Sequence, residues 1–323
     1  MSEITTLPFE QRKFEILIRE ESSTDESKGC KPQDRDIDQL LQKGIIIMDK
    51  PSGPTSHQAV DFLKGILKIK KAGHSGTLDP GVTGVLPVAL NDATRITHPL
   101  LVAGKEYVCL MHFHSDIEDF ESLRKKFLGS ITQLPPKKSA VKRQLRKRTI
   151  YYLELLDVHE RDYLVKIGCQ AGTYIRKLVH DMGLEAGSGA HMAELRRTKA
   201  GPFDESKIVT LQDLADAFHA HKNGDSSILK KIILPIEEGA AHLKKIWVHD
   251  SAIGNLCNGA FLKIPGISKL ESDIKKDDDV AVFSLKQELI LVGKSAFDAK
   301  KLVESKKGIA VNTSQVFMRP GTY

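Results

Sequence analysis

The chain has 323 residues, 41% of them hydrophobic, and its 48 lysine and arginine residues outnumber 42 aspartate and glutamate residues to give a net charge of +6. This length exceeds what a single core usually holds, so we expect two globular domains with packed interiors. No run of about 18 apolar residues predicts a membrane span and the N-terminus lacks a signal-peptide pattern, so we expect a cytoplasmic protein without a membrane partner.

Residues 1–43 are polar and partly acidic, and no chemistry is predicted there. An apolar run at 45–48, bounded by a glycine and a proline, predicts a buried strand. Ser56 then stands where a helix would be capped. Apolar residues at helical spacing up to position 67 predict the buried face of that helix.

A glycine-rich stretch at 73–84 contains one carboxylate, Asp79, with Pro80 directly after it. Its four glycines permit backbone angles that are closed to other residues, and the proline fixes the geometry next to the acid. This pattern would present a single acid in a defined place. Asp-Pro and glycine clusters also mark ordinary surface turns, so these residues alone leave both interpretations open.

Two strands are predicted after this loop. The apolar run 85–90 predicts a buried strand, and residues 91–95 are typical of a helix start. Residues 105–113 alternate in polarity and place Tyr107 on the apolar face. Tyr107 is therefore either a plain core residue or an aromatic platform against which an unstacked base could lie.

A charged helix is predicted near 117–128, and two prolines at 135 and 136 exclude a continuous helix and favour an extended, mobile arm. Positions 137–148 contain seven basic residues and no acidic residue. Such a block attracts a polyphosphate chain through counterion release, although a basic run is also common in solvated loops. The basic residues of this predicted RNA-binding segment are Lys137, Lys138, Lys142, Arg143, Arg146, Lys147 and Arg148.

Alternation over 163–169 predicts a further strand, which ends at a glycine. Thr173 stands at the cap of a helix whose apolar residues recur at i, i+3, i+4 and i+7 from Ile175. Arg176 lies about 100° from that apolar face in the first turn, so it can point out of the core. From its position alone it is equally well an ordinary surface cation.

The remaining chain divides into two parts. A glycine-rich connection at 183–191 precedes the segment 192–203, and helices are predicted near 211–219 and 227–233. From about residue 245 the pattern changes to short strands and turns, which predicts a second, smaller domain. The sequence has no P-loop, no Cys-x-x-Cys pair and no other metal-ligand cluster, so we expect neither a metal site nor a disulfide framework.

Several of these segments, in this order, resemble the motifs of the TruB/dyskerin family of RNA pseudouridine synthases. They are Gly44–His57, Gly73–Gly84, Lys105–Val108, Gly172–Leu178 and Met192–Phe203. Separated motifs in one order are far more specific than any single motif. The run at 137–143 is closer to the archaeal dyskerin branch, the catalytic subunits of H/ACA ribonucleoproteins, than to the stand-alone bacterial tRNA enzymes.

The resemblance implies a role for each candidate site residue. Asp79 would be the catalytic carboxylate, and Tyr107 would lie against the target base. Arg176 would pair with Asp79 and hold the carboxylate ionised and oriented. The further substrate-binding positions that the resemblance implies are Tyr174, Leu195, His57 and Lys50.

The resemblance also implies a fold. The expected class is α+β, with a mixed, largely antiparallel sheet flanked by helices, followed by a small β-rich pseudo-barrel of the RNA-binding PUA type. We expect a catalytic domain at 44–243, with an RNA-gripping thumb loop at 129–150, and a PUA domain at 244–323. The N-terminal extension, residues 1–43, is expected to pack on the C-terminal domain.

The implied reaction breaks the C1′–N1 bond of a flipped-out uridine, rotates the uracil and rejoins it through C5. It needs a carboxylate but neither a metal ion nor a cofactor. The implied partners are the target rRNA or tRNA, an H/ACA guide RNA and the small proteins of that particle. Two alternatives stay open: a guide-independent synthase that acts on the T-loop of tRNA, and a non-catalytic RNA-binding scaffold.

Overall fold

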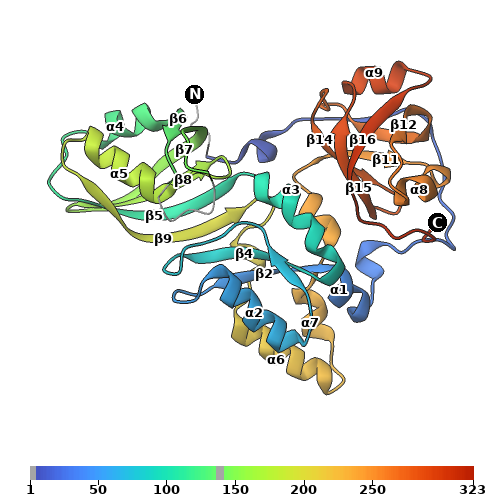
Figure 1. Cartoon of the computed structure of the whole chain (residues 1–323), viewed down its shortest axis with the longest axis horizontal. Helices are drawn as coiled ribbons and strands as arrows, with labels where there is room; N and C mark the ends of the chain where they lie inside the picture. The colour runs from blue at the N-terminus through green and yellow to red at the C-terminus, as the bar shows by residue number, and fades with distance from the viewer. Residues whose placement is uncertain (1–4, 136–141) are drawn as a thin grey trace.

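The computed structural model describes residues 5–135 and 142–323, so Lys137 and Lys138 of the predicted RNA-binding segment lie outside the described residues. Figure 1 shows a larger body built on a long sheet and a smaller, β-rich body that contains the C-terminus. Among the helices of the described ranges, none is long and apolar enough to cross a membrane.

The larger body is built on one sheet, to which nine strands contribute within the described residues. Its order is β10-β2-β4-β9-β5-β8-β7-β6, with β3 attached to β4. β4 and β9 run parallel, whereas the other pairs of this sheet in the described ranges are antiparallel. The strands are β2 (Gly44–Lys50), β3 (Ala72–His74), β4 (Thr83–Leu90), β5 (Lys105–Phe113), β6 (Gly129–Gln133), β7 (Arg146–His159), β8 (Asp162–Cys169), β9 (Ala190–Ala200) and β10 (Leu234–Pro235). The sheet is therefore mixed and largely antiparallel, as predicted.

Two groups of helices cover the two halves of this sheet (Figure 1). α2 (Ser56–Leu67), α6 (Leu211–Lys222) and α7 (Ser227–Ile232) share a core with the side chains of β2 and β4. α4 (Phe120–Phe127) and α5 (Ile175–Glu185) share another core with β5, β7 and β8. The predicted apolar stripe of α5 is its buried face, so the first turn of this helix can present polar side chains at the surface.

Short helices connect the strands of the larger body. α1 (Ile37–Lys43) precedes β2, while η3 (Asn91–Ile96) and α3 (Thr97–Val102) follow β4. Short 3₁₀ helices also occur elsewhere along the chain: η1 (Pro8–Gln11) and η2 (Pro32–Asp34) in the N-terminal segment, η4 (Glu205–Lys207) and η5 (Ile236–Ala240) after β9, and η6 (Ile264–Gly266) in the smaller body.

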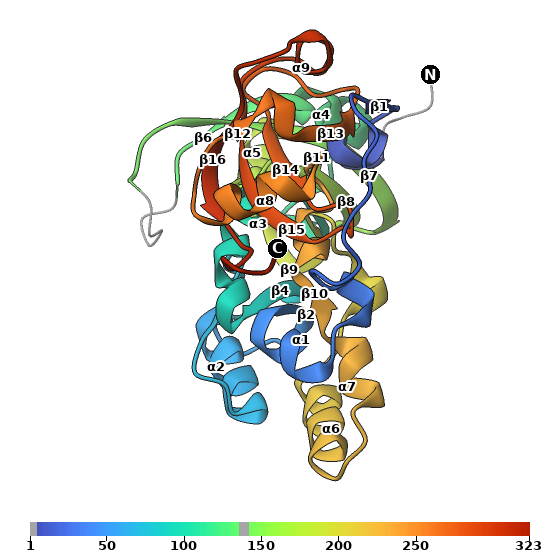
Figure 2. The ribbon, with the colours of Figure 1, turned by 90° about the vertical axis from the view of Figure 1, so that its right-hand side faces the viewer.

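The smaller body contains the second sheet, with seven strands in the described part of the chain. Its strands, in spatial order, are β1 (Ile16–Ile18), β13 (Ile267–Glu271), β11 (Lys244–Val248), β14 (Asp279–Phe283), β15 (Leu289–Ser295), β16 (Ile309–Val316) and β12 (Leu262–Lys263). β1 comes from the N-terminal segment and pairs with β13, and Figure 2 shows it beside this body. Two helices, α8 (Asp250–Cys257) and α9 (Ala299–Glu304), lie among strands and turns where no helix was predicted.

The two bodies share one apolar core. Ile45 and Val85 of the large sheet belong to the same buried cluster as Trp247, Phe283 and Leu289 of the small one. Because this contact is apolar and buried, we expect the two bodies to hold a defined relative orientation.

Both helix-cap predictions were wrong by one residue. Thr55, not Ser56, caps α2, where its hydroxyl accepts from the Gln58 N–H at 3.2 Å. Tyr174, not Thr173, occupies the cap position of α5, and the Thr173 hydroxyl donates to the Gln170 carbonyl at 2.7 Å. Ser56 does not cap α2, because its hydroxyl bonds with the backbone of Leu78 instead.

Most of the predicted extended arm, 134–143, lies outside the described residues, whereas the parts of the predicted thumb loop on either side of it pair as strands. β6 and β7 pair in antiparallel fashion with Gln133 opposite Arg146. Arg146, Lys147 and Arg148 therefore lie in a strand, while Lys142 and Arg143 precede it and are exposed. The described part of the basic segment therefore consists of the start of β7 and two exposed residues that precede it.

Candidate active site

Asp79 lies in the loop between β3 and β4, at the edge of the sheet. Its Oδ2 atom forms an ion pair with Nη2 of Arg176, which comes from the first turn of α5. The two side chains are 55% and 60% exposed, so the pair faces solvent. Such an exposed pair contributes little to stability, and its main effect is to orient the carboxylate.

The backbone of this loop is tied to the end of β2 and the start of α2. The Ser56 hydroxyl accepts from the Leu78 N–H at 2.8 Å and donates to the Leu78 carbonyl at 3.1 Å. The Lys50 ammonium donates to the carbonyls of Pro80 and Val82 at 3.0 and 2.9 Å. Asp79 is therefore exposed, but the chain on both sides of it is fixed.

The sheet register brings four distant residues into one row beneath the loop. Lys50 on β2 lies opposite Gly84 on β4, Gly84 lies opposite Arg197 on β9, and Arg197 lies opposite Tyr107 on β5. Gly84 has φ +101°, and a Cβ atom there would come within 2.2 Å of the Arg197 carbonyl oxygen. The glycine thus allows the close approach of β4 and β9 at this row.

Three buried cations lie beneath or beside the loop. Lys50, Arg197 and Lys105 are 0%, 1% and 4% exposed. Their side chains donate hydrogen bonds to backbone carbonyls, and within the described residues no carboxylate forms an ion pair with them. Burial lowers the pKa of all three, that of Lys105 to about 7. The site thus combines three buried cations beneath or beside the loop with one exposed carboxylate, that of Asp79.

Tyr107 is partly buried and packs against the core beneath α5. Burial raises the pKa of its hydroxyl, and the positive charge of Arg197 opposes this shift. The Asp79 charge is close enough to contribute to the raised pKa of Tyr107. Leu195 lies two residues before Arg197 on β9, opposite Cys109, and packs against the same core.

Tyr174 is fixed through its backbone. Its N–H donates to the Gln133 Oε1 atom at 3.0 Å, and the Gln133 side-chain amide donates to the Tyr174 carbonyl at 3.1 Å. This pair of bonds attaches the start of α5 to the end of β6. Arg176, two residues later, is thereby placed over the Asp79 loop.

His57 is exposed in the first turn of α2, and its ring meets that of His74 edge to face, with centroids 4.9 Å apart. His74 lies five residues before Asp79 and has a buried Nδ1 atom without a partner in the described structure. Burial, with help from His57 and Arg197, lowers the pKa of His74 to about 4. His74 is therefore neutral at physiological pH.

The described basic residues differ in their distance from this site. The guanidinium of Arg148 lies against Gly172, because a Cβ atom added to this glycine would be 3.1 Å from the Arg148 Nε atom. Gly172 shortly precedes α5, so Arg148 lies close to the start of that helix. Lys147 is exposed on the same strand, and Arg146 donates to the Lys142 carbonyl at 3.3 Å. Arg148 thus borders the site, whereas Lys142 and Arg143 precede the strand.

The sequence pattern does not single out Arg197, Lys105 or Gly84 as site residues, and it predicts only a capping role for Ser56. Lys105 and Arg197 lie within the family motifs but have the pattern of ordinary charged residues of strands. A usable signal exists for Arg197, because it stands two residues after Leu195 and so shares its face of β9. A charge on the apolar face of a strand requires local partners.

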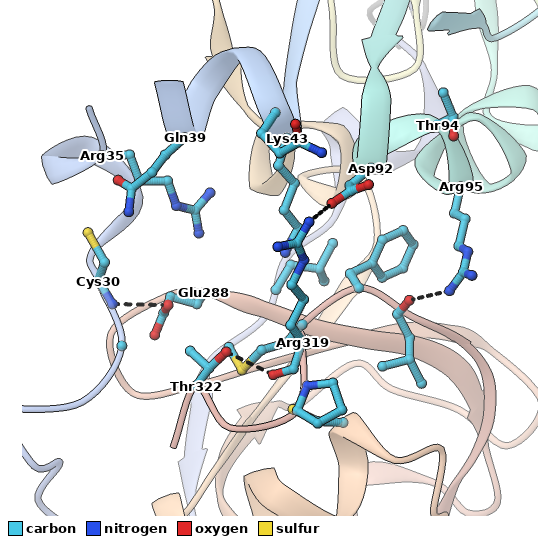
Figure 3. A pocket seen from close by; sticks show the side chains of 18 of the residues that line it. Cys30, Arg35, Gln39, Lys43, Asp92, Thr94, Arg95, Glu288, Arg319 and Thr322 are labelled. Atoms are coloured by element: carbon cyan, nitrogen blue, oxygen red, sulfur yellow. Dashed lines mark hydrogen bonds and ion pairs between the residues drawn. The ribbon is translucent and has the colours of Figure 1, made fainter. Parts of the chain in front are cut away.

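A cavity of about 920 Å³ lies away from Asp79, where α1, η3 and the C-terminal tail meet (Figure 3). It is lined by charges of both signs, and its ion pairs include Arg319 with Asp92. Within the residues that the structure describes, no group of His, Cys, Asp and Glu side chains is arranged to hold a metal ion. The cavity therefore carries no evident chemistry, and the candidate site is the open surface around Asp79.

Models of known families match four parts of the chain. The TruB family pseudouridylate synthase N-terminal domain matches residues 64–122 and 114–175, and the tRNA pseudouridylate synthase B C-terminal domain matches 176–240. The DKCLD (NUC011) domain matches residues 5–60, and the PUA domain matches 244–317.

Whole-length relatives and structures agree with these matches. Proteins named "Probable tRNA pseudouridine synthase B" from Nanoarchaeum equitans and Methanopyrus kandleri are 48% and 49% identical over 98% of this chain, and the alignments cover 92% and 94% of those proteins. A chain in the crystal structure of a Cbf5-Nop10-Gar1 complex superposes with a TM-score of 0.93 at 48% identity, covering 98% of this chain and 97% of that one. A chain in an H/ACA RNP bound to a substrate RNA containing 2′-deoxyuridine gives 0.92 at 44% identity, covering 98% and 99%.

Proposed function

Because the chain belongs to the TruB/dyskerin family of RNA pseudouridine synthases, we propose that it isomerises uridine to pseudouridine at rRNA or tRNA positions that an H/ACA guide RNA selects. The similarity spans 98% of the chain and includes the N-terminal and PUA segments. The observation that carries the assignment to this site is the exposed Asp79–Arg176 pair, with Tyr107 close to Asp79 and Leu195 on β9, the strand next to that of Tyr107.

The chemistry that we propose uses these four side chains. The C1′–N1 bond of uridine breaks, the uracil turns, C5 bonds to C1′, and the C5 proton is lost while N1 gains one. Asp79 acts as nucleophile or as charge stabiliser, and Arg176 orients it through their ion pair. Flipping the uridine costs a few kcal/mol, which stacking on Tyr107 and contact with Leu195 would offset.

We propose that RNA approaches along the basic residues of the β6–β7 hairpin. Arg148 borders the start of α5, and Lys147 is exposed beside it. Each phosphate that these cations neutralise releases counterions. We assign residues 44–243 to catalysis, 244–323 to a PUA domain and 1–43 to an extension that packs on it, which the pairing of β1 with β13 supports.

We further propose that the chain works with small partner proteins in the cytoplasm. Similar chains occur in the crystal structures of a Cbf5-Nop10-Gar1 complex and of the archaeal box H/ACA sRNP Nop10-Cbf5 complex, which supports partners of that kind. The four cysteines of the described residues are free thiols, three of them buried, which suits a reducing compartment.

A second candidate is guide-independent modification of tRNA. The curated relatives carry tRNA pseudouridine synthase names, which is the observation that favours it. Family membership and the joint presence of Asp79, Tyr107 and Arg176 argue against a non-catalytic scaffold.

The deciding experiment measures pseudouridine in substrate RNA incubated with the purified chain, with and without guide RNA and partner proteins. Each reaction is run beside Asp79→Ala. Product that requires the full set and disappears in the variant supports guided activity. Product from the chain alone on tRNA would favour the second candidate, and product from Asp79→Ala would contradict the site assignment.

A further inference from the structure

Arg197 connects two parts of the candidate site through one buried side chain. Its Nε atom donates to the Val85 carbonyl at 2.7 Å, and both Nη atoms donate to the Gly76 carbonyl at 3.3 Å. Tyr107 is its direct neighbour on β5, and the positive charge of Arg197 is close enough to oppose the burial-raised pKa of the tyrosine hydroxyl. One residue thus joins the Asp79 loop to the tyrosine.

This guanidinium has no carboxylate partner within the part of the chain that the structure describes. A buried cation without a counter-charge is unfavourable, and burial lowers the pKa of Arg197. An apolar side chain of similar volume would usually serve stability equally well. Stability alone therefore does not account for an arginine at this position.

The two groups next to Arg197 belong to different parts of the candidate site, the Asp79 loop and strand β5. Gly76 stands three residues before Asp79 and has φ +104°, so the position of its carbonyl reflects the course of the loop. Tyr107 provides the ring. A guanidinium holds its donors in one rigid plane, so it fixes several acceptors relative to one another, which the single ammonium of lysine cannot do.

We propose that Arg197 is a positioning residue for pseudouridine formation, which holds the Gly76 carbonyl of the Asp79 loop and the Tyr107 hydroxyl in one fixed arrangement. It acts through Asp79 and Tyr107 and does not contact the reacting atoms. The carboxylate and the ring are thereby already in place when the flipped uridine enters. The inference rests on the pseudouridine synthase activity proposed above.

The test compares Arg197→Lys with the wild-type chain in single-turnover pseudouridine formation, with guide RNA and partner proteins present. Lysine keeps the charge but cannot hold the same acceptors, so the rate constant is expected to fall about 100-fold, as when reacting groups move by about 1 Å. The affinity for RNA and the melting temperature are expected to stay near the wild-type values. A merely structural role would lower the melting temperature instead.

Coupling to Tyr107 is tested with Tyr107→Phe and the double variant. Because Arg197 acts partly through the tyrosine hydroxyl, the double variant is expected to lose less than the product of the two single losses. Multiplicative losses would contradict the inference, since the two side chains would then act independently.

Arg196→Lys is the matched control. Arg196 is the neighbouring residue on β9, but it pairs with Asp49 at 3.0 Å and Glu205 at 2.6 Å, away from Tyr107. Its rate constant is expected to stay within about threefold of wild type. An Arg197→Lys chain that fails to fold, or one as active as this control, would overturn the inference. Absence of product from the wild-type chain would contradict the proposed function and the inference with it.

Discussion

The Asp79 site and the junction at the cavity of Figure 3 use charge in opposite ways. At the junction, buried Arg35 forms two hydrogen bonds of 2.8 Å with Glu237, and Arg319 pairs with Asp92. At the site, Lys50 and Arg197 donate to carbonyls instead. The junction therefore pairs cations with carboxylates and serves assembly, while the site keeps a positive interior that suits an anionic RNA.

The comparison predicts that removing the site's carboxylate affects activity and hardly affects folding. Asp79→Ala is expected to lower the rate of pseudouridine formation by at least about 1,000-fold, with RNA binding retained. Its melting temperature should stay close to that of the wild type, because the pair with Arg176 is exposed. Quantification of pseudouridine in substrate RNA, beside an RNA-binding assay, checks both parts.

Asp92→Ala is the junction counterpart, since Asp92 is also exposed and paired with an arginine. It is expected to keep wild-type turnover. Equal losses in the two variants would erase the distinction between the regions.

The next largest effect is expected from a substitution at Gly84, where β4 and β9 approach each other closely. Gly84→Ala is expected to lower the free energy of unfolding by about 3 kcal/mol or more, because the new methyl group meets the Arg197 carbonyl and φ is positive. Gly81→Ala, where nothing lies within 4 Å of the added Cβ, is the control and should unfold like wild type. Denaturant titration measures both variants.

At the junction, breaking one ion pair should affect stability but not the chemistry. Glu237→Gln is expected to lower the free energy of unfolding by about 2 kcal/mol, since it leaves the buried Arg35 guanidinium without its counter-charge. The single-turnover rate of the folded fraction should not change. A large loss of rate without a loss of stability would show that the junction also serves the reaction.

The burial of His74 beside the site predicts a pH effect on stability. The pKa of His74 is lowered to about 4 from an ordinary 6.5, so the unfolded chain binds a proton before the native one does. Stability is therefore expected to fall, by roughly 2 kcal/mol from this residue, as the pH falls from about 6.5 to 4. Over that pH range the free energy of unfolding of His74→Gln should fall less than that of the wild type. His242, whose pKa is also lowered to about 4, contributes equally to the fall in both chains.

The smallest effect is expected at the exposed junction pair. Arg319→Ala should lower the free energy of unfolding by less than about 1 kcal/mol, because its pair with Asp92 is exposed to solvent and screened by salt. Thermal unfolding at two salt concentrations measures it. A loss as large as that of Glu237→Gln would contradict the view that burial decides the strength of these pairs.

Local patterns predicted most of the strands and helices. Alternation marked β5 and β8, and the helical stripe marked α5, because each depends on a period within one element. The two caps were missed by one residue, since Ser56 bonds with Leu78, a partner that lies 22 residues away. Helices α8 and α9 were missed because they are short and depend on packing in the small body.

The sequence by itself determined the residue types of the site: an acid between glycines, an aromatic on an alternating strand and an arginine in the first turn of a helix. The tertiary structure alone decided that Lys50, Gly84, Tyr107 and Arg197 form one row, because this depends on the register of four strands that are distant in sequence. It also decided that Arg197 is buried with no carboxylate partner among the described residues. Side-chain burial follows from the packing of all neighbouring elements, which no local pattern contains.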